Sequence, residues 1–523
     1  MSVELMQRLV DVTEATKKET SQIVKERDLI VPDGKPDVQK VLLLDGKIRM
    51  DQIDVQSNRV VYKGQIEVSI LYMPEDQAAG VSKMTGSIPL EDFMILEGLE
   101  ADQRVDFSYE IENMHWNLLN ERKLNVKTII ELKATNTAVK ELAMIEDLKT
   151  DEPIQKRMDT LDIVNMMPYK EEKIIIKDEL TVPQGKPAVA EIIKTDTAIK
   201  DEQIRRTADE IVFNGMVELS ILYRGTEAGR LLEVVHHKIP FSGAIDFPKD
   251  EDEIYWDCEL EVSPTYIQVN PDYDGEDRII EAECIVTAKY TTYNNEKTEV
   301  VSDIYCPGKK VKSVDKLESY VNLVHKENVR VPKKESVQLT GLSPEDQQIY
   351  NVGIKAKVED KILEGDKLTI EGILEIEVCY VDQQNSAPIN SYLDIVPFEI
   401  SIPVQTGSGK NIVDVDVKPK EVQTSSFTRD MLGLEYVLEY LVNVYEQKEM
   451  RILEEVEFED MSKEELSAYP SIIVYTVKPG ENLWDMAKRF NTTVADIAQV
   501  NEVEANYQPR QGEKVIIVKK NKF

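Results

Sequence analysis

Few residues in this sequence have the types and spacing that catalysis needs, and the histidines are the first to consider. The chain has only four, His115, His236, His237 and His325, and none lies in an H-E-x-x-H or paired Cys/His arrangement that could hold a metal. His236 and His237 are adjacent, and adjacent residues of a strand point to opposite faces. The pair therefore cannot share one ligand, and we expect an edge-strand or surface role for it.

The segment TGSGKN, residues 406–411, shares the Gly-Lys pair of a phosphate-binding loop. It lacks the first glycine of that motif, which would lie five residues before Gly409, and Asn411 stands where a magnesium-binding hydroxyl is needed. We interpret the segment as a hairpin turn and not as a nucleotide site.

Carboxylates are the remaining candidates for chemistry, and the chain has 98 of them. In so acidic a sequence any pair at the spacing of a glycosidase dyad would arise by chance, so acid runs are interpreted as solvated strand faces and loops. No catalytic residue, cofactor or metal ligand is predicted. An enzyme whose site is assembled across domains is the rival hypothesis, which a metal assay on the pure protein would test.

The net charge of −35 excludes the classes of protein that bind nucleic acid or anionic membranes, because both ligands demand a cationic face. The charge is unevenly distributed. Residues 471–523 hold eight Lys and Arg against six Asp and Glu, a net +2, which leaves −37 for residues 1–470. The tail is therefore electrically distinct from the body, whose charge fits either a basic partner or simple solubility.

The compartment is predicted from the cysteines and the N-terminal sequence. Cys258, Cys284, Cys306 and Cys379 show no close pairing and are expected to be buried free thiols in a reducing compartment. The first residues carry acids where a signal peptide needs cations, and no window reaches the ~18 apolar residues of a membrane span. We expect a cytoplasmic protein.

An internal repeat is the strongest organisational signal in the chain. Each copy has the pattern h-x-h-x-G-x-h-x-h-x-h-x-Y, where h is apolar, and an Ile-Pro or Val-Pro pair follows whose proline lies 25 residues after the glycine. The first two copies are preceded by V-P-x-G-K-P, which the third lacks. The three segments are VVYKGQIEVSILY from Val60, IVFNGMVELSILY from Ile211 and LTIEGILEIEVCY from Leu368.

The period of about 150 residues is a domain length, so each copy is expected to fold around its own core. The alternation of apolar and polar residues predicts a long strand with one buried face, and its central glycine predicts a bulge, a bend or the close approach of another backbone. Apolar residues at helical spacing predict a helix over residues 3–25. The predicted fold class is mainly β, with three tandem antiparallel, sandwich-like repeats and minor helices.

The predicted domains are repeat 1 over residues 1–150, repeat 2 over 151–310 and repeat 3 over 311–458. A charged segment, residues 459–470, is predicted to be an acidic, semi-flexible tether. The last domain spans 471–523. Its pattern predicts strand, helix, helix, strand, with Asn482 and Thr493 as helix N-caps.

This last domain resembles LysM domains, which bind chains of N-acetylglucosamine. The matching positions are Tyr475, Val477, Gly480, Leu483, Trp484, Ala487, Phe490, Thr492, Asn501 and Gly512. The resemblance implies a sugar groove between the loops 480–483 and 504–511. Both loops depart from the family pattern, since Glu481-Asn482 replaces Asp-Thr and Pro509 removes a possible amide donor.

Three such repeats followed by one LysM domain resemble the SipL family of clostridial spore-coat morphogenetic proteins. The resemblance implies a non-catalytic scaffold in the cytoplasm of the mother cell, at the forespore surface and in the spore coat. There the LysM domain would bind the coat-basement ATPase SpoIVA and couple the coat to the forespore. The alternative is a LysM glycan-binding protein of the cortex or cell wall, which would need an export route.

The candidate partner-binding residues are Trp484, Met486, Ile472, Ile473 and Leu483. Trp484 points about 100° away from the core residue Leu483 on the helix, toward a rim, and is either a partner contact or partly buried packing. Ile472 and Ile473 lie outside the LysM core pattern and belong either to the same patch or to packing against the tether. The partners of the repeats, their orientation and the oligomeric state are not predicted.

Overall fold

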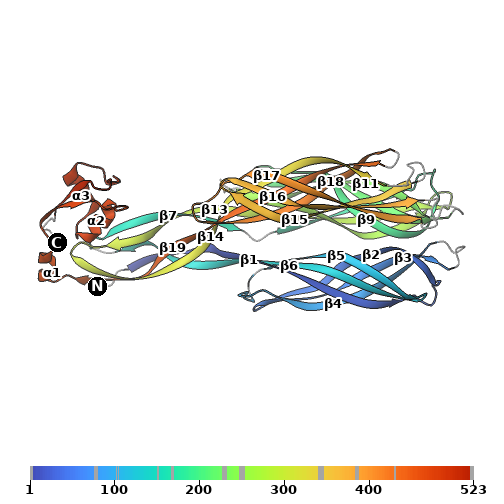
Figure 1. The fold of residues 1–523 in the computed structure, drawn as a ribbon, viewed down its shortest axis with the longest axis horizontal. Coiled ribbons are helices and arrows are strands. Elements are labelled where there is room, and N and C mark those ends of the chain that lie inside the picture. The colour runs from blue at the N-terminus through green and yellow to red at the C-terminus, as the bar shows by residue number, and fades with distance from the viewer. Residues whose placement is uncertain are drawn as a thin grey trace.

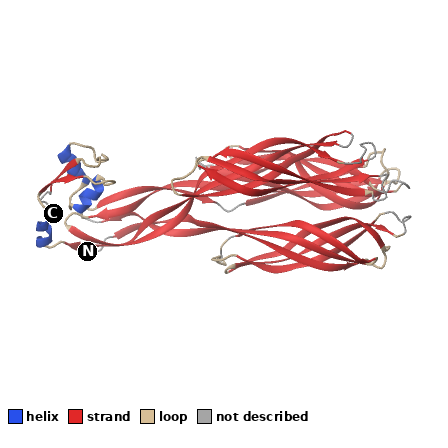
Figure 2. Cartoon of the chain, viewed as in Figure 1, coloured by secondary structure: helices blue, strands red, loops and turns tan. Residues whose placement is uncertain are grey.

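The computed structural model describes residues 4–75, 81–101, 103, 105–149, 152–166, 170–226, 232–246, 254–339, 347–382, 388–428 and 431–518. Within these ranges the chain is almost entirely antiparallel β-structure, with three short helices that all lie after residue 460 (Figures 1 and 2). Three sandwiches form one end of an elongated molecule and the small C-terminal domain forms the other (Figure 1).

The first repeat is a sandwich of two three-stranded antiparallel sheets. One sheet has the order β2 (Val38–Gln56), β3 (Arg59–Pro74), β4 (Ser82–Ile95). The other has the order β1 (Glu4–Ile30), β6 (Lys123–Lys149), β5 (Val105–Asn120). Alternate side chains of both sheets are buried between them, as expected for two half-buried faces. The predicted sandwich is confirmed.

The second and third repeats have the same order of strands, except that two strands of repeat 2 stand where repeats 1 and 3 each have one. In repeat 2 one sheet has the order β9 (Val189–Arg206), β10 (Glu210–Gly225), β11 (Glu233–Asp246). The other contains β12 (Ile254–Pro271) paired to β13 (Asp277–Tyr305), and both β7 (Gln155–Met166) and β8 (Lys170–Thr181) also pair with β13. In repeat 3 the sheets are β15 (Gln347–Glu364), β16 (Lys367–Asp382), β17 (Ile389–Pro403), and β14 (Lys309–Gln338), β19 (Met431–Asp460), β18 (Lys410–Thr428).

The helix predicted over residues 3–25 is wrong, because residues 4–30 form strand β1. The burial period there is two and not 3.6: Val10 and Val12 are buried, whereas Leu9 is exposed. β1 pairs with β6 along its whole length, with register shifts at two places. Long-range pairing therefore overrides a local pattern that fits a helix equally well.

The repeated glycine lies at the centre of the middle strand of each first sheet, opposite a bulge in the neighbouring strand. The bulges interrupt the register beside Gly64, Gly215 and Gly372. A Cβ added to Gly64 would lie 2.3 Å from the carbonyl oxygen of Arg49, and one added to Gly372 would lie 2.2 Å from that of Lys357. The predicted bulge and close backbone approach are both confirmed.

The repeated tyrosine and the V-P-x-G-K-P segment form one structural unit. In repeat 1 the Tyr72 hydroxyl donates to the carbonyl of Pro36 at 2.8 Å, and in repeat 2 Tyr223 donates to that of Pro187 at 2.9 Å. In repeat 1 the Arg122 side chain also donates to backbone carbonyls of the V-P-x-G-K-P turn. The motif is therefore a turn at one end of the sandwich that side-chain hydrogen bonds hold in place.

The three sandwiches contact one another in a ring, and residues of all three meet in a shared apolar cluster that includes Leu71, Leu222 and Val381. Polar contacts join each repeat to the next. They run from Lys83 Nζ to the Ile193 carbonyl (2.6 Å), from His236 Nε2 to the Ile349 carbonyl (3.1 Å) and from Lys355 Nζ to the Ile111 carbonyl (3.0 Å). A closed, head-to-tail arrangement follows, as in a cyclic trimer built from one chain.

Each repeat also extends a β-ribbon beyond its sandwich. The ribbons are formed by β1 with β6, β7 with β13, and β14 with β19, and the longest of these strands have 30 residues, or about 100 Å at ~3.3 Å per residue. The three ribbons pack together around a separate apolar cluster and form a stalk (Figure 1). The stalk carries the C-terminal domain at its tip.

Candidate partner-binding surface

The C-terminal domain has the predicted order of elements. Strand β20 (Ile472–Thr476) is followed by α2 (Leu483–Arg489), α3 (Val494–Asn501) and β21 (Lys514–Val518), which pairs with β20. Both predicted caps are confirmed: the Asn482 side chain accepts from the amide of Asp485, and that of Thr493 from the amide of Asp496, each at 3.0 Å. Helix α1 (Lys463–Ala468) lies within the segment predicted as a tether.

The five predicted partner-binding residues are placed very differently. Met486 and Leu483 are buried in the core of the domain, and Ile473 packs against that core from the inner face of the sheet. In the folded domain Met486 and Leu483 offer a partner no surface, because the helices and sheet enclose them. Ile472 lies on the other face of β20 and is 67% exposed.

The outer face of the two-stranded sheet is apolar and uncovered. Val474 is 62% exposed and Ile516 is 40% exposed. Val474 lies opposite Ile516 in the register, and Ile472 lies opposite Val518, so these four side chains share one face. We call Ile472, Val474, Ile516 and Val518 the outer face. An apolar patch that a fold leaves uncovered is typical of a protein contact.

Sequence reasoning identified only Ile472 of this surface. Val474 and Ile516 were missed, although the signal was present in SIIVYTV and VIIV, where every second residue faces away from the helices. Apolar residues on both faces of a short strand indicate a second apolar surface besides the one that packs on the core.

Trp484 is half-buried, and its contacts come from repeat 2. Its indole Nε1 donates to a carboxylate oxygen of Asp303 at 2.8 Å, and its ring meets that of Tyr305 edge-on, with centroids 4.9 Å apart. Lys488, one turn further along α2, donates to the other oxygen of Asp303 at 2.6 Å. Burial would raise the pKa of Asp303, but the bonds from Lys488 and Trp484 outweigh it and lower the pKa.

Two acids at the loops that would form a sugar groove, Glu481 and Glu513, are bonded to neighbouring groups of the domain. Glu481 accepts from the Tyr475 hydroxyl (2.8 Å) and from the Lys478 amide (3.0 Å), and pairs with Arg489. Just after the second loop, Glu513 accepts from the hydroxyl of Tyr507, a loop residue, at 3.0 Å. These contacts hold the two loops in shape and leave fewer free polar groups to bind a sugar.

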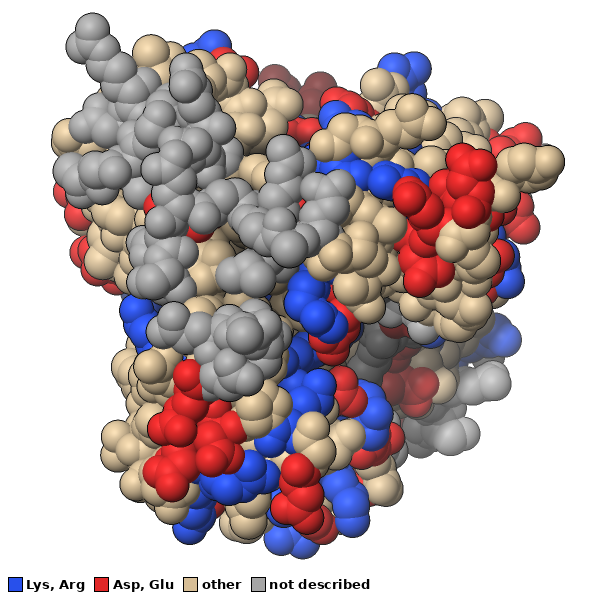
Figure 3. Space-filling model, turned by 90° about the vertical axis from the view of Figure 1, so that its right-hand side faces the viewer, with Lys and Arg blue, Asp and Glu red and all other residues tan. Residues whose placement is uncertain are grey.

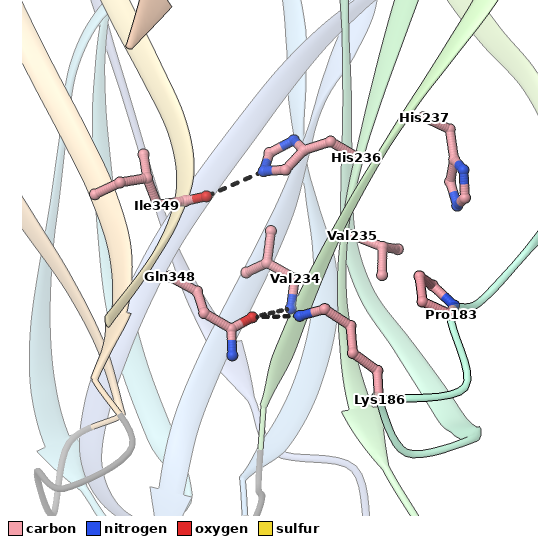
Figure 4. Close-up of a pocket in the computed structure, with 8 residues that line it drawn as sticks. All are labelled: Pro183, Lys186, Val234, Val235, His236, His237, Gln348 and Ile349. Atoms are coloured by element: carbon pink, nitrogen blue, oxygen red, sulfur yellow. Dashed lines mark hydrogen bonds between the residues drawn. The ribbon is translucent and has the colours of Figure 1, made fainter. Parts of the chain in front are cut away.

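The two adjacent histidines lie on β11, which is an edge strand of its sheet as expected, and His236 contributes to a repeat interface. Figure 4 shows His236 pointing toward Ile349 of repeat 3 and His237 pointing to the other side of β11, as the alternation predicts. They line a pocket of about 430 Å³, where Lys186 also donates to the Gln348 side chain across the interface. Burial, followed by the nearby His236, lowers the pKa of His237 and favours its neutral form.

Other sequence candidates for chemistry also have structural roles. The glycine-rich segment 406–411 links β17 in one sheet to β18 in the other, so it is a crossover and not the hairpin we expected. Its Gly409 amide donates to the carboxylate of Glu446, so a carboxylate of the protein takes the position that a bound phosphate would need. The four cysteines are free thiols. No group of three metal-ligating side chains occurs among the residues that the structure describes.

None of the helices in the described ranges is long and apolar enough to cross a bilayer. Figure 3 views the end of the molecule opposite the stalk tip, and on its described part acidic and basic side chains are interspersed. The described part of that end therefore shows both signs of charge side by side.

Two domain families match the chain. The SipL SPOCS domain matches residues 37–119, 188–271 and 346–426, once in each repeat, over strands β2–β5, β9–β12 and β15–β18. The LysM domain matches residues 475–518. No curated protein and no solved structure matches the chain. LysM domains generally bind glycans, and neither family is generally catalytic. With three SPOCS domains and a C-terminal LysM domain, this chain is a sporulation-related member of the SipL family.

Proposed function

We propose that this protein is a non-catalytic scaffold of spore-coat assembly, and that the outer face of its LysM domain binds a SpoIVA-like coat ATPase. The proposal rests on the apolar outer face, on which Ile472, Val474 and Ile516 are exposed and Val518 is partly exposed. Apolar side chains on a rigid sheet suit a protein surface of similar character, and desolvating them supplies the binding free energy.

The LysM loops support a protein partner over a sugar. Sugar recognition needs polar groups that are free to exchange hydrogen bonds with hydroxyls. Here Glu481 in the first loop and Glu513 beside the second are already bonded to neighbouring groups of the domain, and Pro509 has no amide hydrogen to donate.

The rest of the chain supports a scaffold. The repeats form a ring with a long stalk, and the LysM domain lies at the far end of that stalk (Figure 1). Such a shape would keep partners of the repeats and partners of the LysM domain apart along one axis. In this proposal the protein acts in the mother-cell cytoplasm, where the LysM end meets the coat ATPase and the protein couples the coat to the forespore surface.

A calorimetric titration of the full chain tests this function. Purified SpoIVA-like ATPase and N-acetylglucosamine oligomers are titrated separately into the same preparation. We expect saturable binding to the ATPase with a negative heat-capacity change, the mark of apolar burial, and no heat from the sugar. Binding to the sugar alone would overturn the proposal and favour a glycan-binding protein of the cortex or cell wall.

A further inference from the structure

The end of the repeat 2 ribbon contacts helix α2 of the LysM domain, where two side chains of the helix bond to one carboxylate of the ribbon. Asp303, near the end of β13, receives Trp484 Nε1 on one oxygen and Lys488 Nζ on the other, at 2.8 and 2.6 Å. Trp484 and Lys488 are four residues apart, so they lie on the same face of the helix. This whole face of α2 is therefore directed at the stalk.

Tyr305 completes the contact from two residues further along the same strand. Only 4% of its surface is exposed, and it belongs to the apolar cluster of the LysM core and not to a cluster of its own repeat. Its ring meets the Trp484 indole edge-on, an arrangement that adds stabilisation beyond area burial. Repeat 2 thus contributes a core residue to the C-terminal domain.

A third contact joins the turn after α2 to the turn after β13. The amide of Gly308 donates to the side chain of Asn491 at 2.8 Å. Asn491 has a φ of 56°, a left-handed conformation that asparagine tolerates better than most residues, and it is itself buried. Helix α1 also reaches the stalk, since Glu465 pairs with Lys310.

These contacts involve α1, α2 and the turn between α2 and α3, whereas the outer face of the sheet is left open. A domain that moved freely on a tether would not bury a residue of another repeat in its core, as this one buries Tyr305. We propose that Asp303 and Tyr305 latch the LysM domain to repeat 2 in one orientation, and that Trp484 is a positioning residue of this latch. The latch turns the helical face to the stalk and presents the outer face to a partner.

The latch itself does not depend on which partner binds, so it can be tested without one. Hydrogen exchange measured by mass spectrometry on the full chain compares Asp303→Ala with the native protein. We expect exchange of the amides in α1 and α2 to speed up by at least tenfold, because the domain leaves the stalk, while β20 and β21 keep their native protection.

Three further variants make the test specific. Trp484→Phe removes the indole donor but keeps an apolar ring, and Asp303→Asn keeps an acceptor but loses the charge, so each should give a smaller increase than Asp303→Ala. The control is Asp414→Ala, which breaks the exposed pair with Lys18 far from the LysM domain and should change nothing there.

Two results would overturn the latch. Exchange in α2 that stays within twofold of native in Asp303→Ala would mean that the carboxylate holds nothing in place. An equal increase in α2, β20 and β21 would mean that Asp303 is needed for the LysM fold and not for its orientation. A loss of ATPase binding in Val474→Glu with the exchange pattern unchanged would concern the proposed function alone.

Discussion

Replacing Gly372 by alanine should destabilise the third repeat by about 3 kcal/mol, at the upper end of the usual cost of overpacking. The added Cβ would lie 2.2 Å from the carbonyl oxygen of Lys357, and also 2.7 Å from the ring of Phe398. The oxygen belongs to the neighbouring strand of the same sheet, so only a shift of that strand can relieve the overlap. Because alanine also restricts the unfolded chain, a gain of about 0.5–1 kcal/mol partly offsets the cost.

Gly353→Ala is the matched control, since Gly353 lies on β15 of the same sheet and nothing would lie within 4 Å of its added Cβ. We expect this change to be neutral or slightly stabilising. Repeat 3 contains no tryptophan, so the measurement is hydrogen exchange of β16 peptides, which reports the local free energy of opening. Equal protection of β16 in the two variants would mean that the repeated glycine is not required by the bulge.

Replacing Val474 by glutamate is expected to weaken binding of the coat ATPase by about 100-fold, or roughly 2.7 kcal/mol. The change puts a charge at the centre of the outer face, where the partner would have to bury it without a counter-charge. Val474 is 62% exposed in the free protein, so the stability of the LysM domain should change little. Calorimetric titration of the variant gives the affinity, and thermal unfolding checks the fold.

Leu393→Glu provides the comparison, because Leu393 is 60% exposed on strand β17 of repeat 3. It tests whether any exposed apolar residue affects binding. Native affinity in Leu393→Glu together with the loss in Val474→Glu would assign binding to the outer face. Similar losses in both would instead indicate a non-specific effect of added negative charge.

The sequence allowed the repeats and their sandwich class to be predicted, because one strand per copy carries an unbroken alternation around a fixed glycine. The helix predicted over residues 3–25 failed since Leu5, Leu9 and Val12 suit a helix locally, while β1 is stabilised by β6, which is more than 90 residues away in the chain. The ring and the stalk could not be predicted either. They depend on contacts such as Lys83 with Ile193, which no spacing within a single repeat encodes.

The candidate site was predicted in part. The LysM elements and both helix caps follow from local rules. Ile472 lies outside the core as expected, whereas Ile473, which was expected there too, packs against the core. Trp484 was expected to be a partner contact or partly buried packing, and the structure shows packing, against Asp303 and Tyr305. These two residues are about 180 residues away in the chain and were unforeseen. The periodicity of a helix predicts the direction of a side chain, but it does not predict which distant segment of the chain that side chain contacts.

The outer face of the LysM domain is proposed as the surface that meets the coat ATPase. Hydrogen exchange of the full chain, measured with and without the purified ATPase, tests this proposal. We expect added protection of β20 and β21, residues 472–476 and 514–518, with the loops 480–483 and 504–511 unchanged. Protection confined to those loops, or to the three repeats, with none at β20 and β21, would contradict it.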